Sequence, residues 1–147
     1  MTDDLIAFIT ARLDEDEQLA STAGAACGCH PGDTFATWTW TDPHIQAGQH
    51  TVLGGWDWTT AVDDEVGKHI AHWDPARALA EVETKRRILD LHAPLGWYGP
   101  NGPMCSTCGK TGRPGDEDVV VRWPCDTVRL LAMPYATHPD YHEEWRP

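Results

Sequence analysis

Cys105-Ser106-Thr107-Cys108-Gly109 is the stretch of sequence that most constrains the fold, because its two cysteines have two residues between them and a glycine follows. Two thiols at this spacing can bind one metal ion, and the glycine lets the turn close around it. The surrounding residues 94–116 include six glycines and four prolines. A loop of this length is uncommon in a compact domain unless something orders it, and a bound metal would do so.

His92 and Cys125 are the residues that complete this candidate site. Cys125 follows the pair at a separation typical of zinc modules, and His92 lies at the end of a predicted helix that precedes the loop. Three thiolates and one imidazole form a closed tetrahedral set, which is typical of structural zinc. We therefore predict that His92, Cys105, Cys108 and Cys125 hold one structural zinc ion, which clips the loop over residues 94–125.

The sequence leaves alternatives open at this site. A redox-active pair is one alternative for Cys105 and Cys108, but the pair lacks the preceding strand and the following helix of thioredoxin-like motifs. The alternatives to His92 as the fourth ligand are His138, His142 and the group Cys27, Cys29 and His30. That group is a weak signal for a second ion and is also consistent with a flexible loop that holds free thiols.

Length, charge and cysteine content limit the classes of function. The chain has 147 residues, which is enough for one domain, and a formal net charge of -12. This charge opposes nonspecific binding to nucleic acid or anionic lipid, but it permits a basic protein partner or mimicry of nucleic acid. Five cysteines in a chain that lacks a signal-peptide pattern favour reduced thiols and a cytoplasmic location. No apolar run is long enough to span a bilayer.

The spacing of apolar residues and the turn signals predict an α+β fold, with a few helices packed on a small antiparallel sheet. Asp74-Pro75 suits a helix start, since aspartate is a good N-cap and proline suits the first helical position. Pro134 should end or kink the last helix. The predicted elements are an N-terminal helix over 3–20, tryptophan-rich strands within 35–62, a short helix over 63–73, a long helix over 75–92, a strand over 119–123, and a helix over 125–136 followed by a tail.

Two tryptophan pairs mark the predicted strands, Trp38 with Trp40 and Trp56 with Trp58. A strand repeats every two residues, so the members of each pair share a face. Such a face favours a sheet packed on helices, because large aromatic side chains carry much of the burial in small domains. A stacking platform for a base or a sugar is the alternative. The absence of basic residues between positions 35 and 66 argues against nucleic acid.

A catalytic cluster is the main alternative to a purely structural role. His69 and His72 share a helix face, with Glu65 one turn earlier and Asp74 close by. Such a set can bind a metal or act as a general base. The sequence does not contain HExxH, a P-loop, GxGxxG or a nucleophile elbow. The pattern therefore favours two histidines that lie at or near the surface.

Several segments resemble a family of small proteins of unknown function from actinobacteria and their phages. The similar segments are residues 4–8 (DLIAF), 12–17 (RLDEDE), 69–71 (HIA), 74–89 (DPARALAEVETKRRIL) and 125–145 (CDTVRLLAMPYATHPDYHEEW). The resemblance implies no known activity. The family tends to have a histidine just before Asp-Pro, where this chain has Trp73, and this departure weakens a catalytic role for His72. The cysteine pair and Cys125 fit the family's pattern.

Together these observations predict a single domain over residues 1–147 with a zinc-clipped loop. The leading hypothesis is a non-enzymatic accessory or regulatory protein, encoded by a phage or mobile element, that binds an unidentified basic protein through acidic surfaces such as the N-terminal helix. We expect neither direct nucleic-acid binding nor membrane binding. The alternatives are an acidic DNA mimic that inhibits a nucleic-acid-binding protein and a small zinc-dependent hydrolase.

Overall fold

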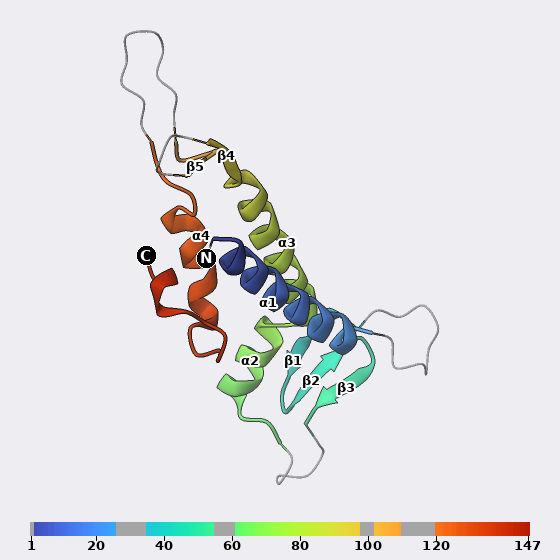
Figure 1. Cartoon of the computed structure of the whole chain (residues 1–147). Helices are drawn as coiled ribbons and strands as arrows, with labels where there is room; N and C mark the ends of the chain where they lie inside the picture. The colour runs from blue at the N-terminus through green and yellow to red at the C-terminus, as the bar shows by residue number, and fades with distance from the viewer. Residues whose placement is uncertain (1, 26–34, 55–60, 98–101, 110–119) are drawn as a thin grey trace. The chain divides into compact units, whose positions relative to one another are not determined.

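A computed structural model describes residues 2–25, 35–54, 61–97, 102–109 and 120–147 of the chain (Figure 1). These residues form helices and two small antiparallel sheets, which confirms the predicted α+β class. They group into two compact units: the first combines residues 1–13 and 83–147, and the second is residues 14–82. The helices α1 (Thr2–Ala23) and α3 (Pro75–Leu91) each contribute residues to both units. The single domain stays a prediction.

The helix α1 forms because its apolar residues recur at helical spacing. Leu5, Ile9 and Leu13 follow one another at intervals of four residues and are all fully buried. Phe8 is also buried. The helix extends a few residues beyond the predicted 3–20 and ends near Gly24, whose amide donates to the carbonyl of Ala20 at 2.8 Å.

The second unit contains a three-stranded antiparallel sheet in the order β1 (Thr39–Thr41), β2 (His44–Ala47) and β3 (His50–Leu53). The central strand supplies the core of this sheet, with Ile45 and Ala47 almost fully buried. Asp42-Pro43 connects β1 to β2, and Gly48 opens the two-residue turn before β3. Gly48 has φ of 59°, and a hairpin turn of this length requires such a residue.

The helix α2 (Asp64–His72) packs beside β1 and explains why position 67 is a glycine. Gly67 is buried, and a side-chain carbon at this position would overlap with the indole ring of Trp40. The Trp40 Nε1–H also donates to Asp64 Oδ1 at 2.7 Å, which holds the ring over the helix. Glycine lowers the intrinsic stability of a helix, but Gly67 leaves room for the ring of Trp40.

We predict that Gly67→Ala destabilises the protein. Alanine is favoured over glycine within a helix by about 1 kcal/mol, but overpacking against the half-buried Trp40 ring costs about 1–3 kcal/mol, so the net change is a loss of up to about 2 kcal/mol. Urea denaturation followed by circular dichroism measures it. In a Trp40→Ala background the same substitution should instead stabilise, because the ring is gone. Stabilisation by Gly67→Ala in the wild-type background would contradict this account.

The start of α3 confirms the predicted Asp74-Pro75 signal. Asp74 is buried, and its carboxylate accepts hydrogen bonds from the backbone amides of Arg77 at 2.8 Å and Trp38 at 3.1 Å. The first bond caps the helix, and the second attaches the segment before β1 to it. Both oxygens of the Asp74 carboxylate therefore have a structural role as hydrogen-bond acceptors.

The first unit contains the two-stranded sheet of β4 (Pro94–Trp97) and β5 (Pro103–Cys105), followed by α4 (Asp126–Ala132). The helix predicted over 125–136 is shorter than expected, since its last part is the 3₁₀ turn η2 (Met133–Tyr135), which includes Pro134. The proline therefore ends the α-helix as predicted.

The prediction of a strand over 119–123 was wrong for residues 120–123, the part of this range that the structure describes. Only Arg122 forms a bridge, to Met104, flanked by hydrogen bonds from Cys105 N to Val121 O and from Trp123 N to Pro103 O. The β-branched composition suits a strand, but a ladder needs a partner. Pro103 cannot donate a hydrogen bond and Pro124 follows directly, so the pairing stops after one bridge.

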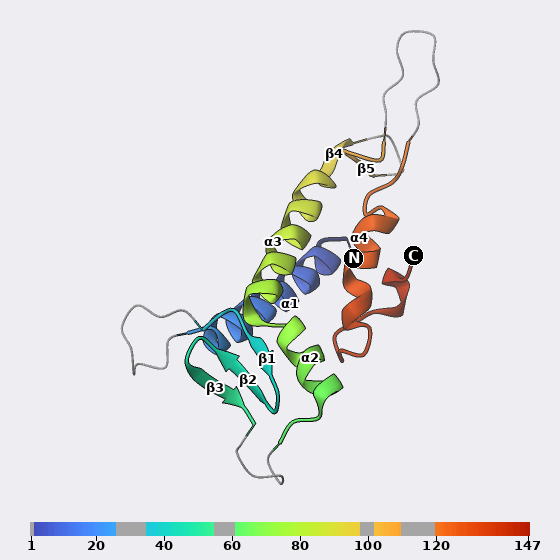
Figure 2. The same ribbon diagram turned by 180° about the vertical axis from the view of Figure 1, so that it is seen from behind.

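The C-terminal tail is fixed within the first unit by its aromatic residues. Trp145, in the 3₁₀ turn η3 (Glu143–Trp145), is 6% exposed, and its ring centroid lies 5.0 Å from that of Phe8. Tyr141 contacts both rings edge-on. Figure 2 shows the C-terminal turns next to α4. This aromatic cluster fixes the chain end onto α1.

Some predictions concern residues outside the described ranges. These are the group Cys27, Cys29 and His30, the pair Trp56 and Trp58, and the parts of the glycine-rich loop at 98–101 and 110–119. Across the ranges that are described, none of the helices combines the length and the apolar character that a bilayer span requires.

Candidate metal centre

The four predicted ligands come from three separate segments of the first unit. His92 directly follows α3, and its amide donates to Ile88 O at 3.0 Å, which continues the helical pattern for one more residue. Cys105 ends β5, Cys108 lies in the turn after it, and Cys125 is the N-cap residue of α4. The structure brings these four residues together, as predicted, and they could hold a metal ion.

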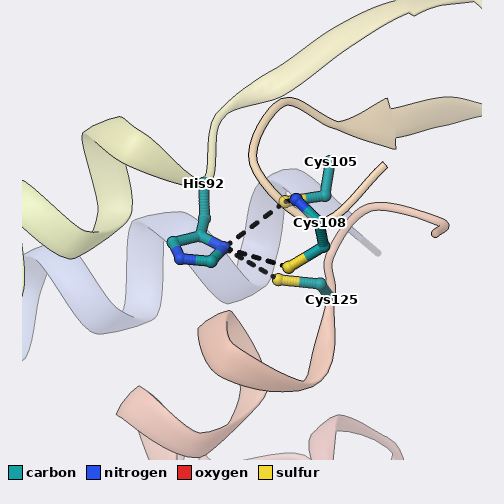
Figure 3. A group of neighbouring side chains, drawn as sticks. All are labelled: His92, Cys105, Cys108 and Cys125. Carbon is teal, nitrogen blue, oxygen red and sulfur yellow. Dashed lines mark hydrogen bonds between the residues drawn. The ribbon is translucent and has the colours of Figure 1, made fainter. Parts of the chain in front are cut away.

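The nitrogen–sulfur distances within the cluster are close to those of a tetrahedral metal site. His92 Nδ1 lies 3.4 Å from each of the three sulfur atoms, those of Cys105, Cys108 and Cys125 (Figure 3). All four donor atoms lie within 4.8 Å of one another. Zinc bound tetrahedrally by three thiolates and an imidazole would place the nitrogen about 3.6 Å from each sulfur. One ring nitrogen has a single proton or a single lone pair, so it cannot satisfy three thiols by hydrogen bonding alone.

The turn between the two cysteines is built by hydrogen bonds around Cys105. Gly109 N donates to Cys105 O at 2.9 Å, and Cys108 N points to Cys105 Sγ at 3.5 Å. The hydroxyls of Ser106, at 2.7 Å, and Thr107 donate to the carbonyl of Leu91 at the end of α3. These bonds attach the turn to the residue that precedes His92, so two of the ligand-bearing segments are fixed to each other.

Trp123 supplies a contact that the sequence did not reveal. Its Nε1–H donates to the carbonyl of His92 at 2.7 Å, and the ring is buried. This bond connects the segment that leads to Cys125 with the end of α3. Outer contacts of this kind orient metal ligands and raise affinity. The only sequence signal was the position of Trp123, two residues before a predicted ligand.

Burial and hydrogen bonding affect the thiols differently. Burial, together with hydrogen bonds to the thiols of Cys105 and Cys125, raises the pKa of Cys108 to about 11. Burial also acts to raise the pKa of Cys125, but hydrogen bonds with the Val128 amide, the other two thiols and the Thr127 amide outweigh it and lower this pKa. Three thiolates in one small volume repel one another, and a bound cation removes that repulsion because metal binding displaces the protons.

Gly109 has a steric role in the turn. A side-chain carbon at this position would overlap with Cγ and Sδ of Met104 and would lie 3.0 Å from the carbonyl oxygen of Cys105. Met104 is 1% exposed, so its side chain has no room to move away. The glycine of the CxxCG pattern is therefore required for the turn to close.

We predict that Gly109→Ala lowers metal affinity about 10- to 100-fold, the range seen when outer contacts of a metal site are disturbed. Competition with a chromophoric chelator measures this affinity. Ser106→Ala is the matched control: it removes one hydroxyl from the same turn, while Thr107 still donates to Leu91 O. Equal affinities for the Gly109 variant and the control would contradict the steric role of this glycine.

The alternative ligands lie elsewhere or are not described. His138 is within hydrogen-bonding distance of Arg12 and packs on Phe8, and the ring of His142 packs on Trp145. Neither belongs to the cluster. The group over residues 27–30 lies outside the described residues.

The histidine cluster considered for catalysis is not assembled in the described part of the second unit. His69 and His72 are exposed on α2, and Arg77 contacts both His72 and the ring of Trp73, with its Cζ 4.0 Å from the ring centroid. Asp74 accepts backbone hydrogen bonds. These residues do not form a group of metal-ligating atoms in that part of the chain.

The chain belongs to DUF6221, a family of unknown function, whose pattern matches residues 2–147. This confirms the predicted membership of a family without a known activity. No curated protein and no solved structure matches the chain.

Proposed function

We propose that this member of the family is a zinc-stabilised accessory protein that binds a basic protein partner and has no catalytic activity of its own. The observation that carries the proposal is the closed set of three thiols and one imidazole. Soft thiolates with an imidazole in tetrahedral geometry favour zinc over magnesium, calcium or manganese. Four protein ligands fill the coordination sphere, and a catalytic zinc would need an open position for water. The ion therefore has a structural role.

The choice of a basic partner rests on charge. The net charge of -12 gives the protein a negative field that attracts cationic surfaces and repels nucleic acid and anionic lipid. Exposed carboxylates gather on α1, where Asp4, Asp14 and Glu15 are all exposed. A helix with such a face suits a partner that is rich in lysine and arginine. Regulation of that partner by a phage-encoded or mobile-element protein, and a cytoplasmic location, stay predictions.

The test compares variants of equal net charge. Tagged wild-type protein, an Asp14→Lys/Glu15→Lys variant and an Asp42→Lys/Glu144→Lys control are each incubated with lysate of the source cell. Recovered proteins are identified and then purified for direct titration. The proposal expects a basic protein that the wild type and the control retain, that the α1 variant loses, and whose binding weakens as salt rises. Equal retention by all three proteins, or no retained basic protein, would overturn it.

A further inference from the structure

A groove of about 650 Å³ lies in the first unit, between the first half of α1 and the second half of α3. Apolar side chains form most of its lining. They are Ile6, Ala7, Leu89, Ala93, Pro94 and Trp123. None of these residues is charged, and grooves of this size and character are the usual form of a binding site in a folded protein.

The walls of the groove limit what can occupy it. Ile6 and Thr10 line one turn of α1, and Arg86 and Leu89 line the opposite wall on α3, with Ala93 just beyond the end of that helix. Backbone groups within a helix already bond to each other, so these walls offer an incoming strand no ladder to join. The occupant must therefore satisfy its own backbone and present side chains. A third helix, packed between the ridges of the two walls, meets both requirements.

A negative charge at one end of the groove favours an occupying helix that has a cationic side chain. Asp90 lines the groove and is exposed, and no ion pair or hydrogen bond joins its carboxylate to another residue in the described ranges. Arg86 lines the same wall one turn earlier but does not pair with Asp90. The carboxylate lies at the C-terminal end of α3, where the helix dipole also favours a cation. An occupant with a lysine or arginine beside its apolar face fits this end.

The candidate metal centre adjoins one end of the groove. Ala93 and Pro94 directly follow His92, and Trp123 both lines the groove and donates its Nε1–H to the carbonyl of His92. A metal bound at the cluster would fix these lining residues in place. A structural zinc ion at this position would therefore keep this end of the groove in its shape.

We infer that this groove binds a basic amphipathic helix of the partner, whose apolar side chains enter between α1 and α3 and whose cation pairs with Asp90. This inference rests on the proposed function, since it names the docking site and the recognised feature of that basic partner. It adds a contact that depends on shape and apolar burial, whereas the acidic face of α1 contributes mainly long-range attraction.

The test uses a defined probe. A labelled peptide of leucine and lysine, about four helical turns long and with all leucines on one face, is titrated into the purified metal-loaded protein at physiological salt, and fluorescence anisotropy is measured. A second peptide has the same composition but a shuffled order without an apolar face. The first peptide should bind at least about tenfold more tightly than the second, because nonspecific attraction to an acidic protein is equal for both.

Substitutions in and outside the groove test whether the peptide binds there. Ala7→Trp fills the groove and should weaken binding of the first peptide about tenfold or more. Ala11→Trp, an exposed alanine of the same helix that does not line the groove, should leave binding unchanged. Asp90→Lys should weaken binding more than Glu144→Lys, which changes the net charge equally. Thr10→Trp replaces Ala7→Trp as the groove-filling variant if circular dichroism or metal content shows that the Ala7 variant is not folded.

Either of two results would overturn the inference: equal affinity for the two peptides, or unchanged affinity when the groove is filled. These failures are separate from failure of the proposed function. A natural basic partner that is lost on charge reversal of α1 but retained by the groove-filling variant would uphold the proposed function and exclude this docking site.

Discussion

Replacing Cys105 with serine is expected to abolish metal binding and the cooperative folding of the first unit. Cys105 is fully buried, and its sulfur is one of four donor atoms that connect the end of α3, the turn after β5 and the start of α4. A serine hydroxyl stays protonated at neutral pH and cannot replace a thiolate. Structural zinc contributes about 10–16 kcal/mol of apparent binding free energy, as much as the whole stability of a typical domain of about 5–15 kcal/mol.

Thermal and urea denaturation with and without a strong chelator measure this effect. The Cys105→Ser variant should behave like the chelator-treated wild type, with lost near-ultraviolet circular dichroism and no cooperative transition of the first unit. Ser106→Ala, one residue away, should keep its metal and its transition. An unfolding midpoint that neither the chelator nor Cys105→Ser changes would mean that the cluster does not hold the fold.

The second large effect is expected at the chain end. Trp145→Ala should destabilise the protein by about 3–5 kcal/mol, the range for removal of a buried aromatic side chain. The Trp145 ring is 6% exposed and packs on Phe8 and Tyr141. Its Nε1–H has no hydrogen-bond partner among the described residues, so packing accounts for the effect. Trp145→Phe should therefore cost much less than the alanine variant.

Trp73→Ala is the matched control for this experiment. Trp73 is 47% exposed, and its main contact is the guanidinium of Arg77 over the ring, which contributes about 0.5–1 kcal/mol at an exposed site. Urea denaturation of the three variants gives the comparison. If the alanine variants of Trp145 and Trp73 lose equal stability, the tail does not form part of the core of the first unit.

The metal cluster could be predicted from sequence because the chemistry of its ligands is local information. A CxxCG turn indicates thiol donors regardless of the fold around it, and His92 followed from the end of a helix with clear periodicity. The contact from Trp123 to the carbonyl of His92 could not be predicted in this way. It depends on how two segments distant in sequence meet, and an indole donor has no characteristic spacing from its acceptor.

Two local features show why element predictions succeed or fail. Asp74-Pro75 defines a helix start through bonds within a few residues, so the sequence is sufficient there. Residues 119–123 have the composition of a strand, but a strand exists only where a partner can pair, and the described part forms one bridge. The need for glycine at position 67 could not be predicted either, because it arises from the ring of Trp40, which belongs to another element.

The most direct test of the metal centre is elemental analysis combined with X-ray absorption on protein purified without added metal. We predict one zinc per chain, with three sulfur ligands at about 2.3 Å and one nitrogen ligand at about 2.0–2.1 Å. Folded protein without metal, or a metal surrounded by oxygen and water in place of sulfur, would contradict the structural zinc site of His92, Cys105, Cys108 and Cys125.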